Sequence, residues 1–315
     1  MIEFNHVSKT FGQQNAVNDL NLHFREGSFS VLIGTSGSGK STTLKMINRL
    51  VEHDSGTIRF AGEEIRSQPV LELRRRMGYA IQSIGLFPHW TVAQNIATVL
   101  KLQKWSRSRI DDRTDELMTL LGLEESLRHR YPHQLSGGQQ QRVGVARALA
   151  ADPQVLLMDE PFGALDPVTR SALQQEMTRI HRLLGRTIVL VTHDIDEALR
   201  LAEHLVLMDA GQVVQQGTPL SMLTTPANDF VQTFFGRSEL GVRLLALRTV
   251  GEFTRRHEQL GGEPLVDEMT LRDALSAFVA RGCEVLPVVD AQGTTCGTLH
   301  FQDLLSSRPH REISV

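Results

Sequence analysis

The octapeptide GTSGSGKS at residues 34–41 has the composition and spacing of a loop that binds nucleotide phosphates. It fits the pattern G-x-x-x-x-G-K-[ST], in which glycines let successive backbone N–H groups point at phosphate oxygens. The pattern predicts that Lys40 reaches the β and γ phosphates and that Ser41 ligates Mg²⁺. A flexible Gly/Ser loop is the alternative, but an apolar segment before the loop and a predicted helix after it are the context that phosphate binding requires. The residues expected to contact the nucleotide here are Gly34, Thr35, Ser36, Gly37, Ser38, Gly39, Lys40, Ser41 and Thr42.

Two adjacent carboxylates close the apolar segment VLLMDE at residues 155–160. A buried strand that ends in Asp159 would deliver one carboxylate to the Mg²⁺ shell, and Glu160 would polarise a water for in-line attack on the γ phosphate. An acidic strand end without a catalytic role is the alternative for this pair. The phosphate loop upstream favours the catalytic interpretation.

Two further polar residues close apolar segments and are expected at the same edge of a sheet. His193 ends TIVLVTH, and Gln82 ends YAIQ. Parallel strands end on the same side of an open sheet, which is the side where ligands bind. We therefore expect His193 to contact the γ phosphate and Gln82 to join Mg²⁺ or the attacking water, although a strand-end histidine can also be merely structural.

A second glycine-rich stretch, LSGGQQQR at residues 135–142, precedes another predicted helix. Ser136 is a good cap residue for that helix, and capping alone is one interpretation. However, Ser136, Gly137, Gly138 and Gln139 also place backbone N–H groups at a helix N-terminus, which makes a second anion site. One nucleotide needs one phosphate cradle, so the second loop is expected to serve a nucleotide held by another copy of the domain.

Composition and segment pattern set the frame for these loops. The chain has 315 residues, 41% of them hydrophobic and 22% charged, with a formal net charge of -3, which is typical of a soluble globular protein of about two domains. No nucleic-acid partner is expected from this balance. The beginning lacks a secretion-signal layout and no apolar run reaches the roughly 20 residues of a spanning helix, so a cytosolic chain is expected. Cys283 and Cys296 are expected to be reduced, and Pro132 interrupts the metal-like spacing of His129 and His133.

The elements that must position the loops follow a recognisable order. Short β-rich segments open the chain, and later compact apolar runs predict strands buried on both faces of a parallel sheet. Residues between 82 and 155 change to a helical pattern and predict a helical insert on an α/β core. Beyond residue 236 an amphipathic helix, two strands and the start of another helix are expected.

In this order, GTSGSGKS, Gln82, LSGGQQQR, VLLMDE, ALD at residues 164–166 and His193 resemble the ATP-binding subunits of ABC transporters. The resemblance covers residues 1–235 and implies an α/β fold: a P-loop ATPase cassette with a RecA-like core, an antiparallel β subdomain and a helical subdomain. It also implies a homodimer in which each ATP lies between the phosphate loop of one copy and the SGGQ loop of the other. Asp166 falls in the loop that crosses the dimer interface. Phe11 matches an aromatic that stacks on adenine, with a plain core phenylalanine as the alternative.

The segment SIGLFPHWTVAQNI at residues 83–96 resembles importer-type cassettes of bacteria. Together, IGTSGSGKSTTLKMINRL, YAIQSIGLFPHWTVAQNIA and the tail CEVLPVVDAQGTTCGTLHFQDLL resemble the ATPase subunits of osmoprotectant importers for glycine betaine, choline or carnitine. This implies two membrane permease subunits, an indirectly coupled solute-binding protein, and a peripheral position on the cytoplasmic face of the cell membrane. Residues 87–90, from Phe87 to Trp90, are candidate permease contacts, and Trp90 could equally belong to the subdomain core. A soluble ABC-type ATPase and a nucleotide-sensing regulatory protein are the alternative functions.

The end of the chain, CEVLPVVDAQGTTCGTLHFQDLL, resembles a single CBS motif, a small α+β module. The expected organisation is a cassette over residues 1–236 with its helical subdomain at about 86–152, a linker over 237–264, a CBS-like module over 265–307 and a frayed tail over 308–315. Relatives often carry two such motifs. Sensing of nucleotide or ionic strength and bracing of the dimer both stay open for the single one.

Overall fold

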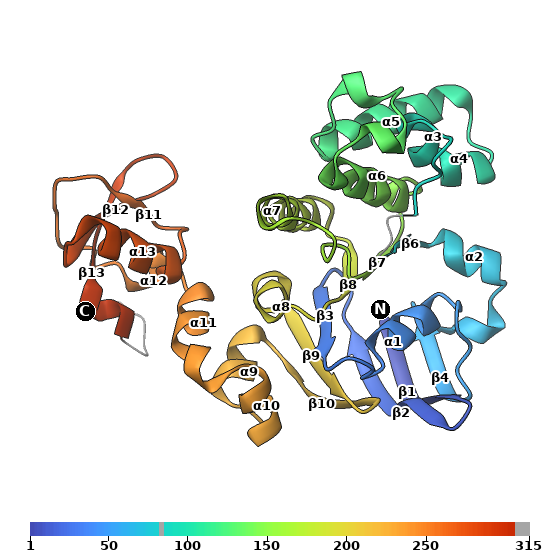
Figure 1. The fold of residues 1–315 in the computed structure, drawn as a ribbon, viewed down its shortest axis with the longest axis horizontal. Helices are drawn as coiled ribbons and strands as arrows, with labels where there is room; N and C mark the ends of the chain where they lie inside the picture. Colours follow the sequence, from blue (N-terminus) through green and yellow to red (C-terminus); the bar gives the residue numbers. More distant parts are fainter. Residues whose placement is uncertain (82–84, 306–315) are drawn as a thin grey trace. The chain divides into compact units, whose positions relative to one another are not determined.

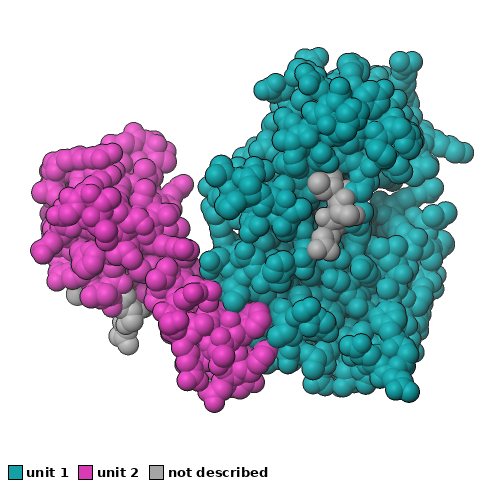
Figure 2. Space-filling view, in the orientation of Figure 1, with its two compact units in different colours: residues 1–218 teal, residues 219–315 magenta. Residues whose placement is uncertain are grey.

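The computed structural model describes residues 1–81 and 85–305. The chain divides into two compact units, Met1–Thr218 and Pro219–Val315 (Figure 2). The division therefore falls before the boundary at residue 236 that the sequence suggested. None of the helices in the described residues combines the length and apolar character that crossing a bilayer requires.

A six-stranded sheet forms the centre of the first unit. Its spatial order is β10 (Gln212–Gly217), β9 (His204–Asp209), β3 (Phe29–Gly34), β8 (Thr187–Val191), β7 (Val155–Asp159) and β6 (Met77–Ala80). Every neighbouring pair is parallel except β10 and β9. β3, β7 and β8 are buried along their whole length, which explains their continuous apolar sequences. The predicted parallel sheet is confirmed.

A four-stranded antiparallel sheet begins the chain. Its order is β2 (Gln14–Phe24), β1 (Ile2–Phe11), β4 (Ser55–Phe60) and β5 (Glu63–Glu64). Its buried side chains form one hydrophobic core with residues of the central sheet, and Phe4 and Phe24 meet edge to face within it. The hairpin between β1 and β2 brings the beginning of β2 beside the phosphate loop, a placement that proves important for the site.

Helices cover and extend the first unit. They are α1 (Lys40–Ile47), η1 (Ile65–Ser67), α2 (Val70–Arg75), α3 (Val92–Ile96), α4 (Thr98–Leu102), α5 (Arg107–Leu120), η2 (Glu125–Leu127), η3 (Pro132–Gln134), α6 (Gly137–Leu149), α7 (Pro167–Leu184) and α8 (Ile195–Leu201). The helices α3 to α6 lie between β6 and β7 in the chain. Figure 1 shows them gathered at the end of the first unit opposite the antiparallel sheet. This arrangement corresponds to the predicted helical insert.

The second unit has its own small core. Its elements are α9 (Pro219–Thr224), α10 (Asp229–Phe234), η4 (Arg237–Glu239), α11 (Leu240–Ala246), α12 (Val250–Phe253), β11 (Leu265–Val266), α13 (Leu271–Arg281), β12 (Val285–Val289), β13 (Thr295–His300) and η5 (Phe301–Leu305). The strands form the sheet β11-β12-β13. Val250 and Phe253 are fully buried in the same core as Phe278 of α13. The segment 237–264, expected to be a linker, is thus partly helical and contributes to this core, because its apolar residues pack against the module that follows.

Candidate functional site

The phosphate loop (residues 34–41) joins the end of β3 to the beginning of α1, as its sequence requires. Gly34 and Gly39 have φ angles of 156° and 98°. A Cβ atom at Gly34 would lie 1.9 Å from the Met208 carbonyl oxygen, and one at Gly39 would lie 2.4 Å from the Ala16 carbonyl oxygen. Both positions therefore need glycine for the backbone conformation and for the close approach of neighbouring strands.

Lys40 is buried, and its ammonium group is held by acceptors of its own loop. Nζ donates to the Gly34 carbonyl at 3.0 Å, the Thr35 carbonyl at 2.7 Å and the Ser38 hydroxyl at 3.1 Å. Burial lowers the pKa of Lys40, and the nearby Glu160 and Asp159 carboxylates partly oppose that effect. The loop thus presents a desolvated positive charge, which a phosphate group would stabilise.

Ser41 and Asp159 meet at the same edge of the sheet. The Ser41 hydroxyl donates to Asp159 Oδ1 at 2.8 Å, and Lys45 Nζ lies 3.8 Å from Oδ2 of the same carboxylate. Hydroxyl and carboxylate oxygens are the donors that Mg²⁺ prefers, and this cation usually completes its shell with water and substrate phosphates. Within the described ranges no three His, Cys, Asp or Glu side chains form a metal cluster of their own. This donor pair fits Mg²⁺ bound together with a nucleotide.

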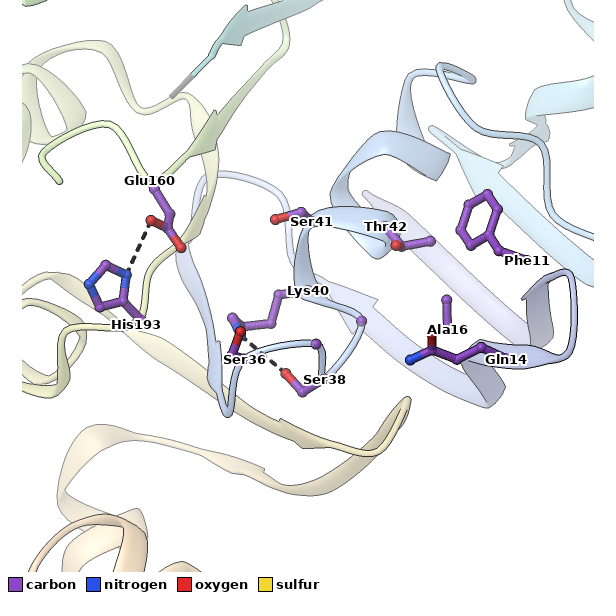
Figure 3. A pocket seen from close by; sticks show the side chains of 12 residues that line it. Phe11, Gln14, Ala16, Ser36, Ser38, Lys40, Ser41, Thr42, Glu160 and His193 are labelled. Atoms are coloured by element: carbon purple, nitrogen blue, oxygen red, sulfur yellow. Dashed lines mark hydrogen bonds and ion pairs between the residues drawn. The ribbon is translucent and has the colours of Figure 1, made fainter. Parts of the chain in front are cut away.

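Glu160 and His193 form a contact at the ends of β7 and β8. His193 Nδ1 lies 3.1 Å from Glu160 Oε2 (Figure 3), and the imidazole is largely exposed. The Glu160 backbone N–H donates to the Val191 carbonyl at 2.9 Å, which holds Glu160 at a φ of 46°. The strand end that carries the histidine therefore also fixes the glutamate. Gln82, predicted at the neighbouring strand end, lies outside the described residues.

Lys40, Ser41, Glu160 and His193 share one cavity of about 620 Å³, and Asp159 adjoins it through its hydrogen bond with Ser41. It is lined by Phe11, Gln14, Ala16, Ser36, Gly37, Ser38, Gly39, Lys40, Ser41, Thr42, Glu160 and His193. Figure 3 shows Phe11, Gln14 and Ala16 on one side of the phosphate loop and Glu160 with His193 on the other. Phe11 is 50% exposed, so the core-phenylalanine alternative is wrong. Sequence reasoning missed Gln14 and Ala16, because the β1–β2 hairpin carries them to the cavity and no local motif marks them.

The SGGQ loop (residues 136–139) lies elsewhere in the first unit and contributes nothing to the described lining of that cavity. Ser136 is exposed and caps α6: its hydroxyl accepts from the Gln139 N–H at 3.3 Å, and Gln139 Oε1 accepts from the Ser136 N–H at 2.9 Å. Gly138 is buried, and a Cβ atom there would lie 2.3 Å from Thr169 Cγ2 of α7. The structure confirms the predicted cap and leaves the exposed Gly137 at its open end.

Asp166 caps α7 rather than facing the cavity. Its Oδ1 accepts from the backbone N–H groups of Val168 and Thr169 at 3.1 Å each. The hydrogen bonds from Thr169, together with that from Val168, hold the pKa of Asp166 below its usual value. Two hydrogen bonds thus attach the ALD loop (residues 164–166) to the first turn of α7.

Comparison with known proteins decides the family. Residues 17–163 match the ABC transporter family model. The glycine betaine uptake system ATP-binding protein YehX of Escherichia coli (strain K12) is 86% identical over 97% of this chain and 99% of its own length. This chain belongs to the ATP-binding proteins of the ABC transporter family. The glycine betaine/carnitine/choline transport ATP-binding protein OpuCA of Bacillus subtilis (strain 168) is a further relative, 44% identical over 99% of this chain and 82% of its own.

A solved ABC cassette has the same fold as this ABC protein. The dimeric structure of MJ0796, a bacterial ABC transporter cassette, matches with a TM-score of 0.63 and 34% identity over 70% of this chain and 99% of that one. A second structure of that cassette is a dimeric post-hydrolysis state bound to ADP and Pi. The predictions of the ABC cassette fold and of ATP binding and hydrolysis are therefore confirmed. ABC cassettes dimerise, and the roles of individual residues in this one stay predictions.

Proposed function

We propose that this chain is the ATPase subunit of a bacterial glycine betaine uptake system, in which ATP binding and hydrolysis drive import. The observation that carries the proposal is 86% identity with a glycine betaine uptake ATP-binding protein across nearly the whole of both chains. Relatives named for carnitine and choline transport are less similar, at 43% and 52% identity. We therefore place glycine betaine first among the osmoprotectants.

The geometry supports the following roles in hydrolysis. The phosphate loop binds the phosphates with backbone N–H groups, and Lys40 exchanges its loop carbonyls for β and γ oxygens. Ser41 and Asp159 would hold Mg²⁺, which when bound neutralises charge on those oxygens. Glu160 accepts a proton from the attacking water, while His193, 3.1 Å away, orients that carboxylate. Gln82 would complete the water or metal site.

A second copy of this chain completes each site. The SGGQ loop and Asp166 are apart from the cavity, and the first turn of α6 offers N–H groups at an exposed end, Ser136 and Gly137. Such a helix end binds anions. We infer a homodimer in which this loop contacts the γ phosphate held by the partner, with the half-exposed Phe11 stacked on the adenine. The dimeric state of the solved ABC cassettes supports this arrangement.

Two permease subunits would transmit the closure of this dimer to the membrane. Phe87 is 39% exposed, and its ring lies 4.5 Å from that of the partly buried Trp90. This pair forms an aromatic surface on the helical subdomain that a short permease helix could cover. The permeases would keep the chain on the cytoplasmic face of the membrane, with a solute-binding protein on the other side.

We assign residues 265–305 to a single CBS-like module. The order α13, β12, β13 and η5 corresponds to the helix, two strands and helix of that motif. The preceding α12 packs into the same core, so a useful truncation must end before it. A chain ending at residue 218 that still supports uptake, but no longer responds to medium osmolality, would favour sensing over bracing.

The uptake of labelled glycine betaine tests the proposal directly. Cells that lack this chain are complemented with the wild type or with Glu160→Gln, and the purified proteins are assayed for ATPase activity. We expect wild-type uptake and ATPase activity to be restored, and both to fall about 100-fold in the variant, because general-base catalysis contributes about that much. Glycine betaine uptake that is independent of this chain would contradict the transport function. Rapid ATP turnover by Glu160→Gln would contradict the role of the glutamate.

A further inference from the structure

The turn that carries His193 is held from behind by a buried glutamate. Glu197 is 6% exposed, and its Oε2 accepts a hydrogen bond from the Thr192 hydroxyl at 3.1 Å. That hydroxyl in turn accepts from the Asp194 backbone N–H at 3.0 Å. Both neighbours of His193 are therefore fixed, whereas the imidazole itself is largely exposed at the cavity.

A single arginine connects this turn with the ALD loop. Asp194 caps α8 through Oδ1, which accepts from the Glu197 N–H at 2.9 Å, and its Oδ2 lies 3.5 Å from Nη1 of Arg170. Nη2 of the same guanidinium donates to the Leu165 carbonyl at 3.1 Å. Leu165 directly precedes Asp166. One planar side chain thus touches the loop expected at the dimer interface and the turn that orients the histidine.

The chemistry of arginine suits this bridging position. Its guanidinium presents several N–H groups in a rigid fork, so two acceptors on different loops can be held at a fixed separation, whereas a lysine ammonium is a point charge on a flexible stem. The Arg170 side chain is about one third exposed, and its Nε is buried without a hydrogen-bond partner among the described residues. The contacts with Asp194 and with the Leu165 carbonyl therefore hold the guanidinium in place.

We propose that Arg170 is a positioning residue that couples the ALD loop to His193, so that docking of a second cassette against Asp166 sets the histidine relative to Glu160. The inference rests on the proposed function as an ATPase that dimerises. It assigns to one side chain the connection between Asp166, in the loop after β7, and His193, in the loop after β8. Arg170 itself touches no substrate.

Steady-state ATPase kinetics of the full-length protein test this role. We expect Arg170→Ala to lower kcat about tenfold, in the range observed for residues that transmit coupling, while the affinity of the Glu160→Gln background for ATP changes less than about twofold. Arg170→Lys keeps the charge and loses the fork, so it should stay impaired. Arg200→Ala is the matched control, because Arg200 also joins α8 to α7, through the Ser171 hydroxyl at 3.3 Å, and has no hydrogen bond to either loop within the described part of the chain.

A double-mutant comparison separates positioning from mere stabilisation of the fold. If Arg170 acts through the histidine, Arg170→Ala should have no further effect on kcat once His193→Ala is present. A full additional loss in that background, full activity of Arg170→Lys, or equal effects of Arg170→Ala and Arg200→Ala would each overturn the inference. The proposed function fails separately, if the wild-type chain itself shows no dimer-dependent ATP hydrolysis.

Discussion

The phosphate loop and the SGGQ loop are both glycine-rich helix beginnings, but the chain builds them differently. At the phosphate loop, glycines with φ angles of 156° and 98° lie against neighbouring strands, and a buried lysine fills the centre. At the SGGQ loop, the glycines continue a regular helix, and a serine–glutamine capping box closes its exposed beginning. The first loop is organised by the chain's own tertiary structure. The second is organised by its own capping box, and its first residues, Ser136 and Gly137, are exposed.

This difference teaches how one site can be divided between two copies of a chain. Lys40 and Ser41 of the phosphate loop line one cavity with Glu160 and His193, whereas the SGGQ loop and Asp166 are kept apart from it by their attachment to α6 and α7. Under the proposed function, a monomer binds a nucleotide but brings only part of the groups to the γ phosphate. Substitutions in the two loops should accordingly fail in different ways.

The largest effect is expected from Gly39→Ala in the phosphate loop. The new Cβ atom would lie 2.4 Å from a backbone carbonyl of β2 at a φ that alanine rarely adopts, so the loop must open. We expect ATP affinity to fall by about three orders of magnitude, equivalent to roughly 4 kcal/mol. Gly137→Ala is the control, since its Cβ would meet only Leu165 Cδ2 at 3.8 Å. Equilibrium binding of a fluorescent ATP analogue measures the affinity of each variant. Equal losses of affinity in the two variants would contradict the difference between the two loops.

Ser136→Ala should impair hydrolysis while leaving ATP binding by the monomer intact. Loss of one hydrogen-bond donor to developing charge reduces turnover by about 100-fold in other sites. A mixture with Lys40→Ala sharpens the test. A mixed dimer has one site in which the Lys40 of one copy faces the Ser136 of the other, so ATPase activity should rise above that of either variant alone. No recovery on mixing would argue against a shared site.

Gly138→Ala is expected to cause an intermediate loss of about tenfold in kcat. Its Cβ would lie 2.3 Å from Thr169 Cγ2, which would press α6 away from α7. Thr169→Ser removes that methyl group and keeps the hydroxyl beside Asp166, so the double variant should recover most of the activity. A double variant as slow as Gly138→Ala would show that the glycine is needed for a reason other than this helix contact.

The smallest effect is expected from Glu197, the buried glutamate behind the turn that carries His193. Burial raises the pKa of Glu197 to about 7; Asp194 and Glu160 add to the rise, and Thr192 and Arg170 oppose it. An acid with a raised folded-state pKa is most stabilising when protonated, so the free energy of unfolding should fall as the pH rises through 7. Between pH 6 and 8 the wild type should lose about 1 kcal/mol relative to Glu197→Gln in urea unfolding. The more exposed Glu203→Gln should retain the wild-type pH dependence.

The sequence predicts well where the phosphate loop, the two carboxylates after β7 and His193 lie, because these positions depend on local sequence. A glycine pattern between a strand and a helix, and carboxylates that close a buried strand, each specify backbone geometry within a few residues. Lys40, Ser41, Glu160 and His193 line one cavity, with Asp159 bonded to Ser41, because the parallel strands β3, β7 and β8 end at one edge of the sheet.

Features that depend on distant segments were not predictable in the same way. Gln14 and Ala16 reach the cavity only because a hairpin folds over the phosphate loop. Arg170 reaches Asp194, 24 residues further along the chain, only because α7 packs against α8. The helices within residues 237–264 were missed for a similar reason, because Val250 and Phe253 are buried by the core that the rest of the second unit forms.

The backbone conformation of Glu160 lowers the stability of the fold at a residue expected to take part in hydrolysis. A glutamate at a φ of 46° is in the left-handed conformation, which costs it about 1 kcal/mol more than it would cost glycine. The carboxylate proposed to accept the proton thus lies on a strained backbone, whose N–H donates to the carbonyl of Val191 just before the turn that carries His193. Any movement that breaks this hydrogen bond would withdraw the Glu160 carboxylate from the cavity and inactivate the subunit without unfolding it.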